Sequence, residues 1–349
     1  MRILIVQTAF LGDVVLTLPL IEVVRQHFPS ACVDVLTIPA YAPILQNQPL
    51  VDAVLTYDKR GRQKGIKGLL RMMREIRTQG YDLIISPHRS LRSALLVAGS
   101  GSPQRVGFRH GLTRWAYTST VARSTTGHEV ERHHQLMTLL SRTPPDRPGQ
   151  ITLHVQETSR REAEQYFAHH GVKDADIVVG MIPGSQWGTK RWPAEQFAAL
   201  IEQLSARART HCVLFGAPSD RPIADAIVTA CHAPVLDLVG KTALRDLPAY
   251  LASCTVVVSN DTGPMHVAAA LGKPIVTLYG PTTAALGFSP YGVLWEEASV
   301  DLDCRPCDAH GPQRCPLSHW RCMRNLSAEQ VANAVQRLLH RTSLAAEMG

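Results

Sequence analysis

The sequence lacks the signatures of several common protein classes. It contains no uninterrupted apolar run approaching the roughly 18 residues that span a bilayer. Residues 1–6 resemble a first buried strand and show no signal-peptide cleavage pattern. Short-period repeats and low-complexity tracts are absent as well. We therefore expect a globular cytoplasmic protein, whose 349 residues suffice for two α/β domains of ordinary size.

Common nucleotide-binding and nucleic-acid-binding motifs are also missing. Neither half contains the GxGxxG dinucleotide fingerprint, and no segment has the Walker A spacing. These absences argue against a nicotinamide-dependent dehydrogenase and against a P-loop NTPase. No RNP-like aromatic motif or helix-turn-helix pattern stands out, so we expect no nucleic acid as a partner.

Charge is distributed unevenly along the chain. Residues 1–150 carry a net charge of +9 and the remainder a net charge of −2. A basic first half indicates an anionic partner, and by charge alone nucleic acid, anionic lipid and a phosphorylated glycolipid all qualify. Ordinary solvated surface remains the alternative for any single arginine. The densest basic run is either a solvated loop or a contact with a membrane surface, and it consists of Lys59, Arg60, Arg62, Lys64 and Lys67.

Apolar strand-like segments alternate with helical periodicity along the chain. We expect a strand over residues 2–8, a turn over 10–13 and a helix over 14–27. A second series of the same kind begins with a strand over Ile177–Ile182. This βαβ alternation predicts mostly parallel sheets in two Rossmann-like halves with a cleft between them. Residues 141–150, rich in Pro, Arg and Gly, predict a loop near the domain junction.

The segment 259–272, SNDTGPMHVAAALG, carries the most chemical information. Apolar runs flank it, which predicts a strand, a tight polar turn, a short helix and another strand. The turn places Asp261, Thr262 and Gly263 at the N-terminus of a helix, where free N–H groups suit a phosphate. His266 lies in the first helical turn and can face the same ligand. The alternative is a capped helix in which Asp261 is structural.

A second candidate phosphate contact is the loop expected after the strand Ile177–Ile182. Two glycines permit close approach of the backbone, two hydroxyl groups can donate hydrogen bonds, and a lysine supplies a cation. The alternative is a surface loop before a helix. The residues concerned are Gly184, Gly188, Ser185, Thr189 and Lys190.

Asp13 follows the first expected strand at its carboxyl end. A carboxylate at that place can act as a general base on a substrate hydroxyl group. It can equally cap the helix expected to begin near Val14. The pattern by itself leaves both interpretations open.

Four of the eight cysteines form a cluster with the spacing C-x2-C-x7-C-x6-C. Four thiolates at such spacing can close a tetrahedral zinc or iron site. A reducing cytoplasm favours a metal over two disulfides, and free thiols are the third alternative. A closed four-sulfur site would be structural and would pin the loop before the last helix. The expected ligands are Cys304, Cys307, Cys315 and Cys322.

Taken together, these motifs resemble the ADP-heptose:lipopolysaccharide heptosyltransferases, glycosyltransferase family 9. The matching pieces run in order over nearly the whole chain, and their combination is specific although each alone is weak. They are Arg2-Ile3-Leu4-Ile5 with Gly12-Asp13, Pro183-Gly184-Ser185 with Lys190-Arg191-Trp192-Pro193, Leu214-Phe215-Gly216, Asn260-Asp261-Thr262-Gly263 with Met265-His266-Val267-Ala268-Ala269-Ala270-Leu271, and Leu278-Tyr279-Gly280-Pro281-Thr282.

The resemblance implies a GT-B fold of two Rossmann-like domains. Residues 1–165 would bind the acceptor and residues 166–349 the nucleotide sugar, and the last helix could pack back on the N-terminal domain. The implied reaction moves heptose from ADP-heptose to a hydroxyl group of an anionic acceptor, with inversion and without a catalytic metal. Lipopolysaccharide core is the expected acceptor. Alternatives are another nucleotide sugar or a protein acceptor, because some relatives with a cysteine-rich end glycosylate proteins.

The resemblance also implies roles for particular residues, and places the enzyme in the cytoplasm at the inner membrane surface. Asp13 would deprotonate the acceptor, while Lys190 and His266 would stabilise the departing pyrophosphate. The residues expected to bind the nucleotide sugar are Gly184, Ser185, Thr189, Lys190, Gly216, Asp220, Asp261, Thr262, Gly263 and His266. Those expected to bind the acceptor glycolipid are His88, Arg89, Arg92 and Arg109.

Overall fold

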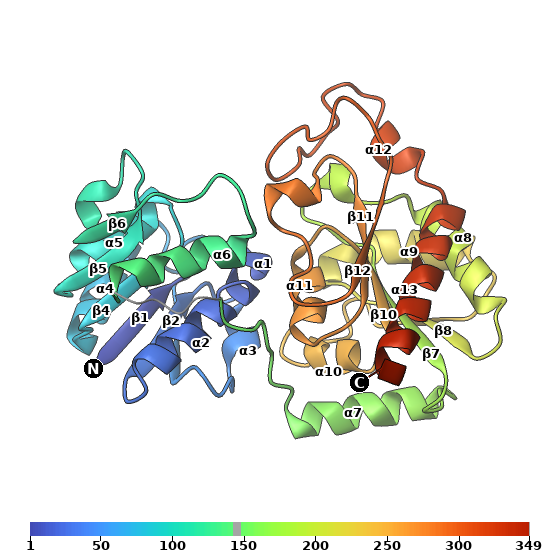
Figure 1. Cartoon of the computed structure of the whole chain (residues 1–349), viewed down its shortest axis with the longest axis horizontal. Coiled ribbons are helices and arrows are strands. Elements are labelled where there is room, and N and C mark those ends of the chain that lie inside the picture. Colours follow the sequence, from blue (N-terminus) through green and yellow to red (C-terminus); the bar gives the residue numbers. More distant parts are fainter. Residues whose placement is uncertain (142–147, 349) are drawn as a thin grey trace. The chain divides into compact units, whose positions relative to one another are not determined.

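The computed structural model describes residues 1–141 and 148–348 of the chain. The middle of the loop expected near the domain junction, residues 142–147, lies outside the described residues. The chain divides into two compact units, Met1–His154 and Val155–Gly349. Figure 1 shows the elements of both units in chain order.

The first unit is built on a six-stranded parallel sheet with the strand order β3-β2-β1-β4-β5-β6. Its inner strands are continuous apolar runs, such as RILIV in β1, which is typical of strands covered on both faces. The strands are β1 (Arg2–Val6), β2 (Cys32–Thr37), β3 (Ala53–Thr56), β4 (Leu83–Ser86), β5 (Gln104–Phe108) and β6 (Ser119–Val121). The helices are α1 (Leu11–Val15), α2 (Leu18–His27), α3 (Ala42–Leu45), α4 (Gly65–Gln79), α5 (Leu91–Gly99) and α6 (Glu129–His134), with the 3-10 turns η1 (Arg114–Ala116) and η2 (Gln135–Leu139).

The second unit repeats this architecture with the strand order β12-β11-β10-β7-β8-β9, again entirely parallel. Its strands are β7 (Ile177–Ile182), β8 (Thr210–Leu214), β9 (Val235–Asp237), β10 (Val256–Asn260), β11 (Ile275–Tyr279) and β12 (Trp295–Ser299). Its helices are α7 (Glu157–His169), α8 (Ala194–Ser205), α9 (Arg221–Ala230), α10 (Leu247–Ala252), α11 (Gly263–Ala270), α12 (Arg321–Arg324) and α13 (Ala328–Met348), with the 3-10 turns η3 (Gly188–Lys190), η4 (Pro218–Asp220) and η5 (Ala284–Leu286).

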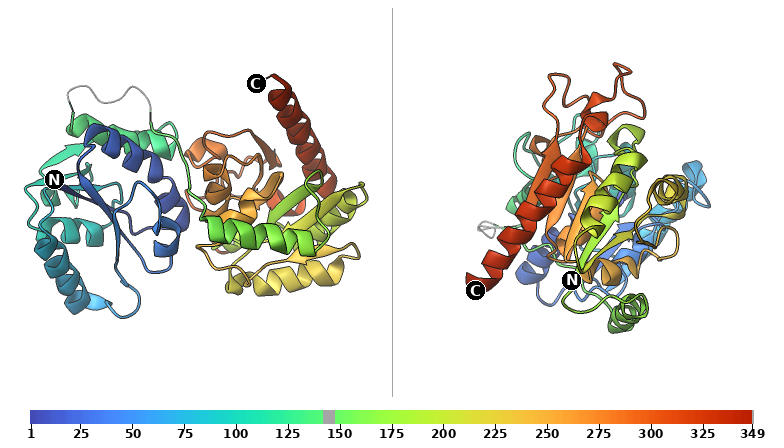
Figure 2. Two further views of the ribbon diagram at one scale, coloured as in Figure 1. Left: turned by 90° about the horizontal axis from the view of Figure 1, so that it is seen from below. Right: turned by 90° about the vertical axis from the view of Figure 1, so that its right-hand side faces the viewer.

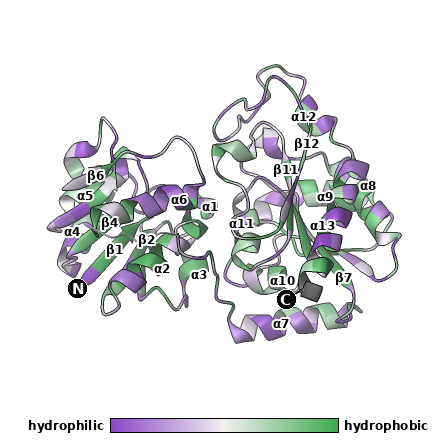
Figure 3. Cartoon of the chain, viewed as in Figure 1, coloured by the Kyte–Doolittle hydropathy of each residue, from purple (hydrophilic) through white to green (hydrophobic). Residues whose placement is uncertain are grey.

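Each unit has its own hydrophobic core between its sheet and its helices. In the first unit, Met72 and Ile76 of α4 pack with Leu96 of α5 against the sheet. In the second unit, the fully buried Trp192 lies in a core shared by the sheet, α8 and α13. Figure 3 shows the strands of both sheets in the colours of hydrophobic residues. The two parallel-sheet halves confirm the expected α/β fold class.

The last helix, α13, has its packing partners in the second unit. It lies against α8 and along β12 and β11 (Figure 2). An exposed ion-pair group adds to this contact, because Arg337 and Arg341 of α13 both reach Glu296 of β12. Among the residues described, no helix is both long and apolar enough to cross a bilayer.

The single helix expected over residues 14–27 is wrong in detail. The structure has α1 from Leu11 to Val15 and a separate α2 beginning at Leu18. Pro19 sits in the first turn of α2, where a residue without an N–H group is tolerated. The Thr17 hydroxyl between the two helices donates to the carbonyl oxygen of Asp13 at 2.7 Å. The chain therefore turns at this point and keeps Asp13 near the carboxyl end of β1.

Candidate functional site

In the second unit, loops from neighbouring strands meet at the carboxyl edge of the sheet. The strands β11, β10, β7 and β8 are neighbours in that order. The register pairs Ser259 of β10 with Ile182 of β7, and Asn260 with Leu278 of β11. The turn after β10 therefore lies between the loop after β7 and the loop after β11, at the edge where open α/β sheets bind ligands.

Asp261 joins these three loops through its carboxylate. Lys190 Nζ donates to Asp261 Oδ2 at 2.6 Å, and Thr282 Oγ1 donates to the same oxygen at 2.7 Å. The side chains of Lys190 and Asp261 are each 9% exposed, and Thr282 is fully buried. A buried ion pair is favourable only when further hydrogen bonds satisfy it, and the Thr282 hydroxyl supplies one. The structure thus brings together the predicted Lys190 and Asp261, and adds Thr282.

Asn260 clamps the loop after β7 to β10. Its Nδ2 donates to the carbonyl oxygen of Pro183 at 2.7 Å, and its Oδ1 accepts the backbone N–H of Trp192 at 3.1 Å. Asn260 is completely buried. The nitrogen and the oxygen of its side-chain amide bind the two ends of the loop. The position of Lys190 within that loop is therefore set by the sheet.

The glycines of this edge permit close contacts within the protein. A Cβ atom on Gly184 would lie 2.4 Å from Cγ of Asp220, and one on Gly216 would lie 3.1 Å from the Cβ of Asp220. Asp220 in turn accepts the backbone N–H of Ala217 at 2.9 Å through Oδ2. Gly184, Gly216 and Asp220 therefore form one contact group between the loops after β7 and β8, which only glycine allows.

The N-terminus of α11 belongs to the same edge. Thr262 precedes the helix in an extended conformation, and Gly263 is its first residue. Helix N-termini present free N–H groups and a partial positive charge, which suits an anion. His266 lies on this helix and is buried, as are Ser185 and Thr189 in the loop after β7. Together with Lys190, the helix end gives this edge the chemistry of a phosphate site.

A segment that the sequence did not connect with this site covers part of it. We call residues 303–320 the strap. The hydroxyl of Thr189 donates to the carbonyl oxygen of Pro312, and Trp320 Nε1 donates to the carbonyl oxygen of Thr189 at 2.9 Å. Gln313 Nε2 donates to the carbonyl oxygen of Gln186 at 3.0 Å. The strap is therefore hydrogen-bonded along the loop after β7, and its Pro312 carbonyl oxygen engages the Thr189 hydroxyl.

Arg305 of the strap holds the loop after β11. Its guanidinium group is 7% exposed and donates to the carbonyl oxygens of Tyr279, at 3.2 Å, and Thr282, at 3.1 Å. It also donates to the carbonyl oxygens of Gly280 and Val300. A planar group with five donors can bind several carbonyls at once. Arg305 thereby fixes the loop that carries Thr282 to Asp261.

The four clustered cysteines, three in the strap and Cys322 in α12, do not form the expected metal site. Over the described part of the chain, no three His, Cys, Asp or Glu side chains lie in a group that could hold a metal ion. Cys304, Cys307, Cys315 and Cys322 are free thiols, so neither disulfides nor four-sulfur coordination is seen. The prediction of a structural zinc or iron is not supported.

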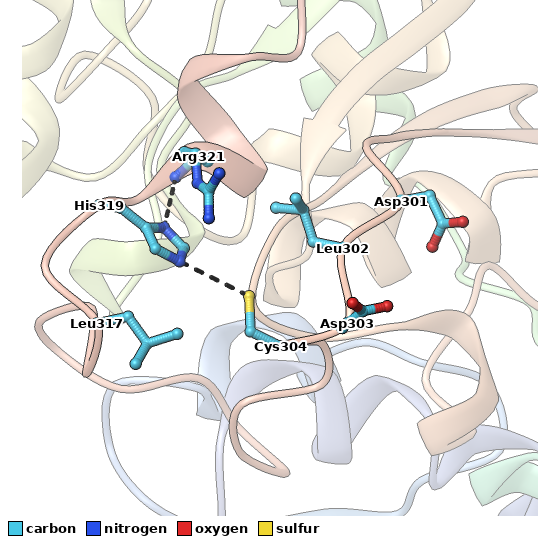
Figure 4. A pocket seen from close by; sticks show the side chains of 7 residues that line it. All are labelled: Asp301, Leu302, Asp303, Cys304, Leu317, His319 and Arg321. Atoms are coloured by element: carbon cyan, nitrogen blue, oxygen red, sulfur yellow. Dashed lines mark hydrogen bonds between the residues drawn. The ribbon is translucent and has the colours of Figure 1, made fainter.

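His319 lies between two of these thiols instead. Its Nε2 is 3.9 Å from Cys304 Sγ and its Nδ1 is 4.0 Å from Cys315 Sγ. Burial raises the pKa of Cys315, but backbone N–H groups of residues 317–320 outweigh it and hold the pKa below the ordinary thiol value. Figure 4 shows the adjoining cavity of about 350 Å³, which is lined by Asp301, Leu302, Asp303, Cys304, Leu317, His319 and Arg321.

In the first unit, Asp13 lies on α1 at the carboxyl edge of its sheet. Its Oδ2 accepts the backbone N–H of Phe10 at 3.1 Å, so the carboxylate closes the first turn of the helix from its third position. The helix begins at Leu11, which corrects the expectation that Asp13 precedes it as the N-cap. Asp13 is partly buried.

His88 and its neighbours form a polar group beside this turn. His88 Nδ1 lies 2.8 Å from Ser93 Oγ and 3.1 Å from Thr8 Oγ1. Burial, followed by the charges of Lys59 and Arg89, lowers the pKa of His88 to about 4. The ring is therefore neutral at pH 7 and acts through hydrogen bonding rather than charge.

The cations of this edge divide into anchored and exposed ones. Lys59 Nζ donates to the carbonyl oxygen of Thr8 at 2.6 Å, and burial lowers the pKa of Lys59. Arg92 Nη1 donates to the hydroxyl of Tyr57 and to the carbonyl oxygen of Lys59, both at 3.3 Å. Arg89 and Arg109 are exposed. Lys59 belongs to the basic run that the sequence assigned to a solvated loop or a membrane contact. Its side chain thus reaches the predicted acceptor site.

Sequence reasoning assigned no role to Thr282 and gave Lys59 a different one. A usable signal for Thr282 was its place just after β11, because that strand pairs with the strand bearing Asp261. The signal for Lys59 was weaker. It follows β3, an edge strand, and only the long side chain of lysine carries its charge to Thr8 at the end of β1.

Comparison with known proteins identifies the family. A model of glycosyltransferase family 9 (heptosyltransferase) matches residues 69–319. The chain belongs to this family. It is 29% identical over 294 residues to lipopolysaccharide heptosyltransferase 2 of Escherichia coli K12, covering 81% of this chain and 84% of that protein. It is therefore a glycosyltransferase, as the resemblance in sequence implied.

Solved structures agree with this assignment. The structure of a glycosyl transferase of family 9 from Veillonella parvula superposes with a TM-score of 0.86 at 28% identity, covering 97% of both chains. Escherichia coli heptosyltransferase WaaC with ADP-2-deoxy-2-fluoro heptose has a TM-score of 0.73 at 24% identity, covering 97% of this chain and 99% of that one. The two Rossmann-like units thus constitute the GT-B fold.

Proposed function

We propose that this protein transfers heptose from ADP-heptose to a hydroxyl group of lipopolysaccharide core, with inversion at the anomeric carbon. One observation carries the proposal: the buried group of Lys190, Asp261 and Thr282 beside the N-terminus of α11. This arrangement suits a sugar linked to a pyrophosphate. A relative that acts on lipopolysaccharide and a family structure containing an ADP-heptose analogue support the choice of substrates.

The second unit would bind the donor. Its pyrophosphate would lie against the N–H groups of α11 at Thr262 and Gly263, with Lys190 and His266 on the same edge. Positive charge placed before the reaction stabilises the negative charge that develops on the departing diphosphate. Asp261 would hold Lys190 in place, and the remaining predicted donor contacts are Gly184, Ser185, Gly216 and Asp220. The hydroxyl of Thr189, also predicted to contact the donor, donates to the strap instead.

The first unit would bind the acceptor and supply the base. The Asp13 carboxylate would take the proton of the acceptor hydroxyl, whose oxygen forms the new bond to the anomeric carbon. The bond from that carbon to the diphosphate breaks, and ADP leaves with the electron pair. A single displacement of this kind inverts the configuration, and it needs no catalytic metal. His88, Arg89, Arg92 and Arg109, joined by Lys59, would bind the anionic acceptor in the cytoplasm at the inner membrane.

Transfer from ADP-heptose to heptose-deficient lipopolysaccharide cores, read by mass spectrometry, tests the proposal. We expect a gain of one heptose on one of the cores. Asp13→Asn should lower kcat by about a thousandfold or more while ADP binding is kept, as for loss of a general base. Lys190→Ala should weaken binding of the nucleotide sugar.

The outcomes separate the parts of the proposal. No gain on any core, with ADP still binding, would overturn the acceptor and direct the search to other sugars or to protein acceptors. Near-normal turnover by Asp13→Asn would remove Asp13 as the base. Unchanged donor affinity in Lys190→Ala would remove that side chain from the phosphate site.

A further inference from the structure

Three segments of the first unit concentrate positive charge at one edge of its sheet. Residues 59–71, 87–93 and 109–115 follow the carboxyl ends of β3, β4 and β5. They contain ten Lys and Arg residues and no Asp or Glu. The acid just before them, Asp58, is engaged by the backbone N–H groups of Gly61 and Arg62 at 2.8 Å each. The proposed acceptor contacts account for only some of these ten cations.

The same three segments expose large apolar side chains. Leu112 is 77% exposed and Trp115 is 58% exposed. Single exposed apolar residues are normal on protein surfaces, but a cluster of them marks an interaction site. The other members of the set are Ile66, Leu70 and Leu91.

The first two turns of α4 present both kinds of side chain outward. Ile66 and Leu70 are four residues apart and therefore lie on one face of the helix. Lys67 and Arg71 have the same spacing and are also exposed. The opposite face carries Met72, which packs in the core. This part of α4 is thus an amphipathic helix whose solvent-facing side is apolar and basic.

The turn after β5 holds its apolar residues in a defined conformation. Trp115 Nε1 donates to the carbonyl oxygen of Leu112 at 3.0 Å, and the Thr113 N–H donates to the carbonyl oxygen of His110 at 2.9 Å. Thr113 and Ala116 are buried and anchor the turn to the first unit. The turn therefore presents Leu112 and Trp115 on an ordered backbone, which lowers the ordering cost on binding.

These parts form one surface because α5 connects them. The helix α5 packs against both α4 and η1. All three elements start at the carboxyl edge of the sheet, in the blue and green half of Figure 1. We call the exposed side chains of Ile66, Lys67, Leu70, Arg71, Leu91, Arg109, Leu112, Arg114 and Trp115 the docking face.

We propose that the docking face binds the surface of a bilayer containing anionic lipid. Trp and Leu side chains partition into the interface between headgroups and acyl chains, and Lys and Arg are attracted to anionic headgroups. A nucleic acid would meet the cations but leave the apolar side chains without partners. The inference rests on the proposed function in that a lipid-linked acceptor requires the enzyme to work at such a surface.

Co-sedimentation of the whole chain with vesicles tests the inference. The vesicles are phosphatidylcholine alone, or phosphatidylcholine mixed with phosphatidylglycerol, without any acceptor. We expect binding to the anionic vesicles, weakened by salt because the attraction is partly screened. The double variant Leu112→Ser, Trp115→Ala should lower the partition constant on the order of tenfold. Val228→Ser, which replaces an exposed apolar side chain on α9 of the other unit, should leave it unchanged.

Thermal unfolding verifies that the variants fold, and a transfer assay with a delipidated core separates this inference from the proposed function. Wild-type transfer without vesicle binding overturns the docking face alone. Vesicle binding without transfer overturns the proposed function alone. If the double variant loses transfer to the delipidated core in proportion to vesicle binding, the face is part of the sugar site and the membrane inference fails. Lys67→Glu with Arg71→Glu provides a second, purely electrostatic variant that should also weaken vesicle binding.

Discussion

Thr282 shows how a single hydroxyl can set the geometry of an ion pair. Asp261 receives hydrogen bonds from both Lys190 and Thr282 on the same oxygen, in a place almost free of water. When one of these two donors is removed, we expect the Asp261 carboxylate to change its orientation. The direction in which Lys190 presents its ammonium group therefore depends on a residue that carries no charge.

We predict that Thr282→Val lowers kcat/KM for the donor by about tenfold. A hydrogen bond to a charged group contributes about 1.5–3 kcal/mol, and valine keeps the shape of threonine without the hydroxyl. Steady-state kinetics with varied donor checks this. Thr283→Val is the matched control, because Thr283 makes no side-chain cap hydrogen bond. Equal loss in both variants would contradict the role of the Thr282 hydroxyl.

His88 predicts a pH dependence of stability. Burial holds its pKa at about 4 in the folded protein, against about 6.5 in the unfolded chain. Between these values the unfolded chain binds a proton that the folded protein does not, so the free energy of unfolding decreases as pH falls from about 6.5 to 4. The full effect is about 2–3 kcal/mol.

Urea unfolding at pH 7 and pH 4 measures this dependence. We expect His88→Gln to reduce the loss of stability between the two pH values, while His232→Gln, at an exposed position, leaves it unchanged. The comparison concerns the difference between the two pH values, so a general destabilisation by either substitution does not affect it. Parallel pH curves for wild type and His88→Gln would show that His88 is protonated in the folded state.

Among the elements, the strap and the loop after β7 act as one unit. Gly311 of the strap has a φ of +84°, and a Cβ atom there would lie 3.1 Å from Lys190 Cε and 3.2 Å from Pro281 Cγ. The backbone of the strap thus contacts the aliphatic part of the Lys190 side chain, which belongs to the proposed donor site. Lys190 is enclosed by Asp261 on one side and by Gly311 on another.

We predict that Gly311→Ala displaces Lys190 and weakens ADP binding several-fold, as measured by calorimetry. Gly272→Ala is the control, since Gly272 has a φ of +73° but nothing within 4 Å of its added Cβ. Both substitutions should destabilise the protein by about 1–2 kcal/mol, the cost of a left-handed conformation. Only Gly311→Ala should alter ADP affinity. A similar change in both variants would mean that strain, and not contact with Lys190, is responsible.

At the scale of the whole molecule, the chain consists of two units with separate cores. The proposed donor edge and the strap belong to the second unit, and the proposed acceptor edge and the docking face belong to the first. Ligand binding therefore stabilises the unit that holds the site before it affects the other.

Hydrogen exchange with and without ADP tests this division. We expect protection to concentrate in residues 183–190, 261–266, 280–282 and 303–320, because these segments form or cover the donor edge. Exchange in the core strands of the first unit should change little. Protection centred on residues 1–154 would place the nucleotide in the wrong unit and contradict the assignment of the donor site.

Much of the fold could be predicted because local patterns encode it. Apolar runs such as RILIV and the alternating helical periodicity identify the β/α units, since burial of a strand or helix face depends on residues close in sequence. The motif at 259–272 likewise predicts a turn followed by a helix, which the structure has in α11. The parallel direction of the strands follows from the same alternation, whereas their order is seen only in the structure.

The details of the site depended on side-chain contacts that residue type and spacing do not reveal. The spacing of four cysteines suggested a metal, but packing leaves Cys304 and Cys315 on either side of His319. The start of α1 at Leu11 depends on the Asp13 carboxylate reaching the Phe10 N–H, which composition does not reveal.

By itself, the sequence determined two parallel α/β units and a family, and it named Asp13, Lys190 and Asp261 as candidate site residues. Only the tertiary structure decided that Thr282 shares Asp261 with Lys190, that Arg305 holds the Thr282 loop, and that the strap occupies Thr189. The reason is physical. Periodicity records which residues are buried along one element, whereas a hydrogen bond between separate loops, here 21 to 123 residues apart, is decided by how the sheet brings those loops together.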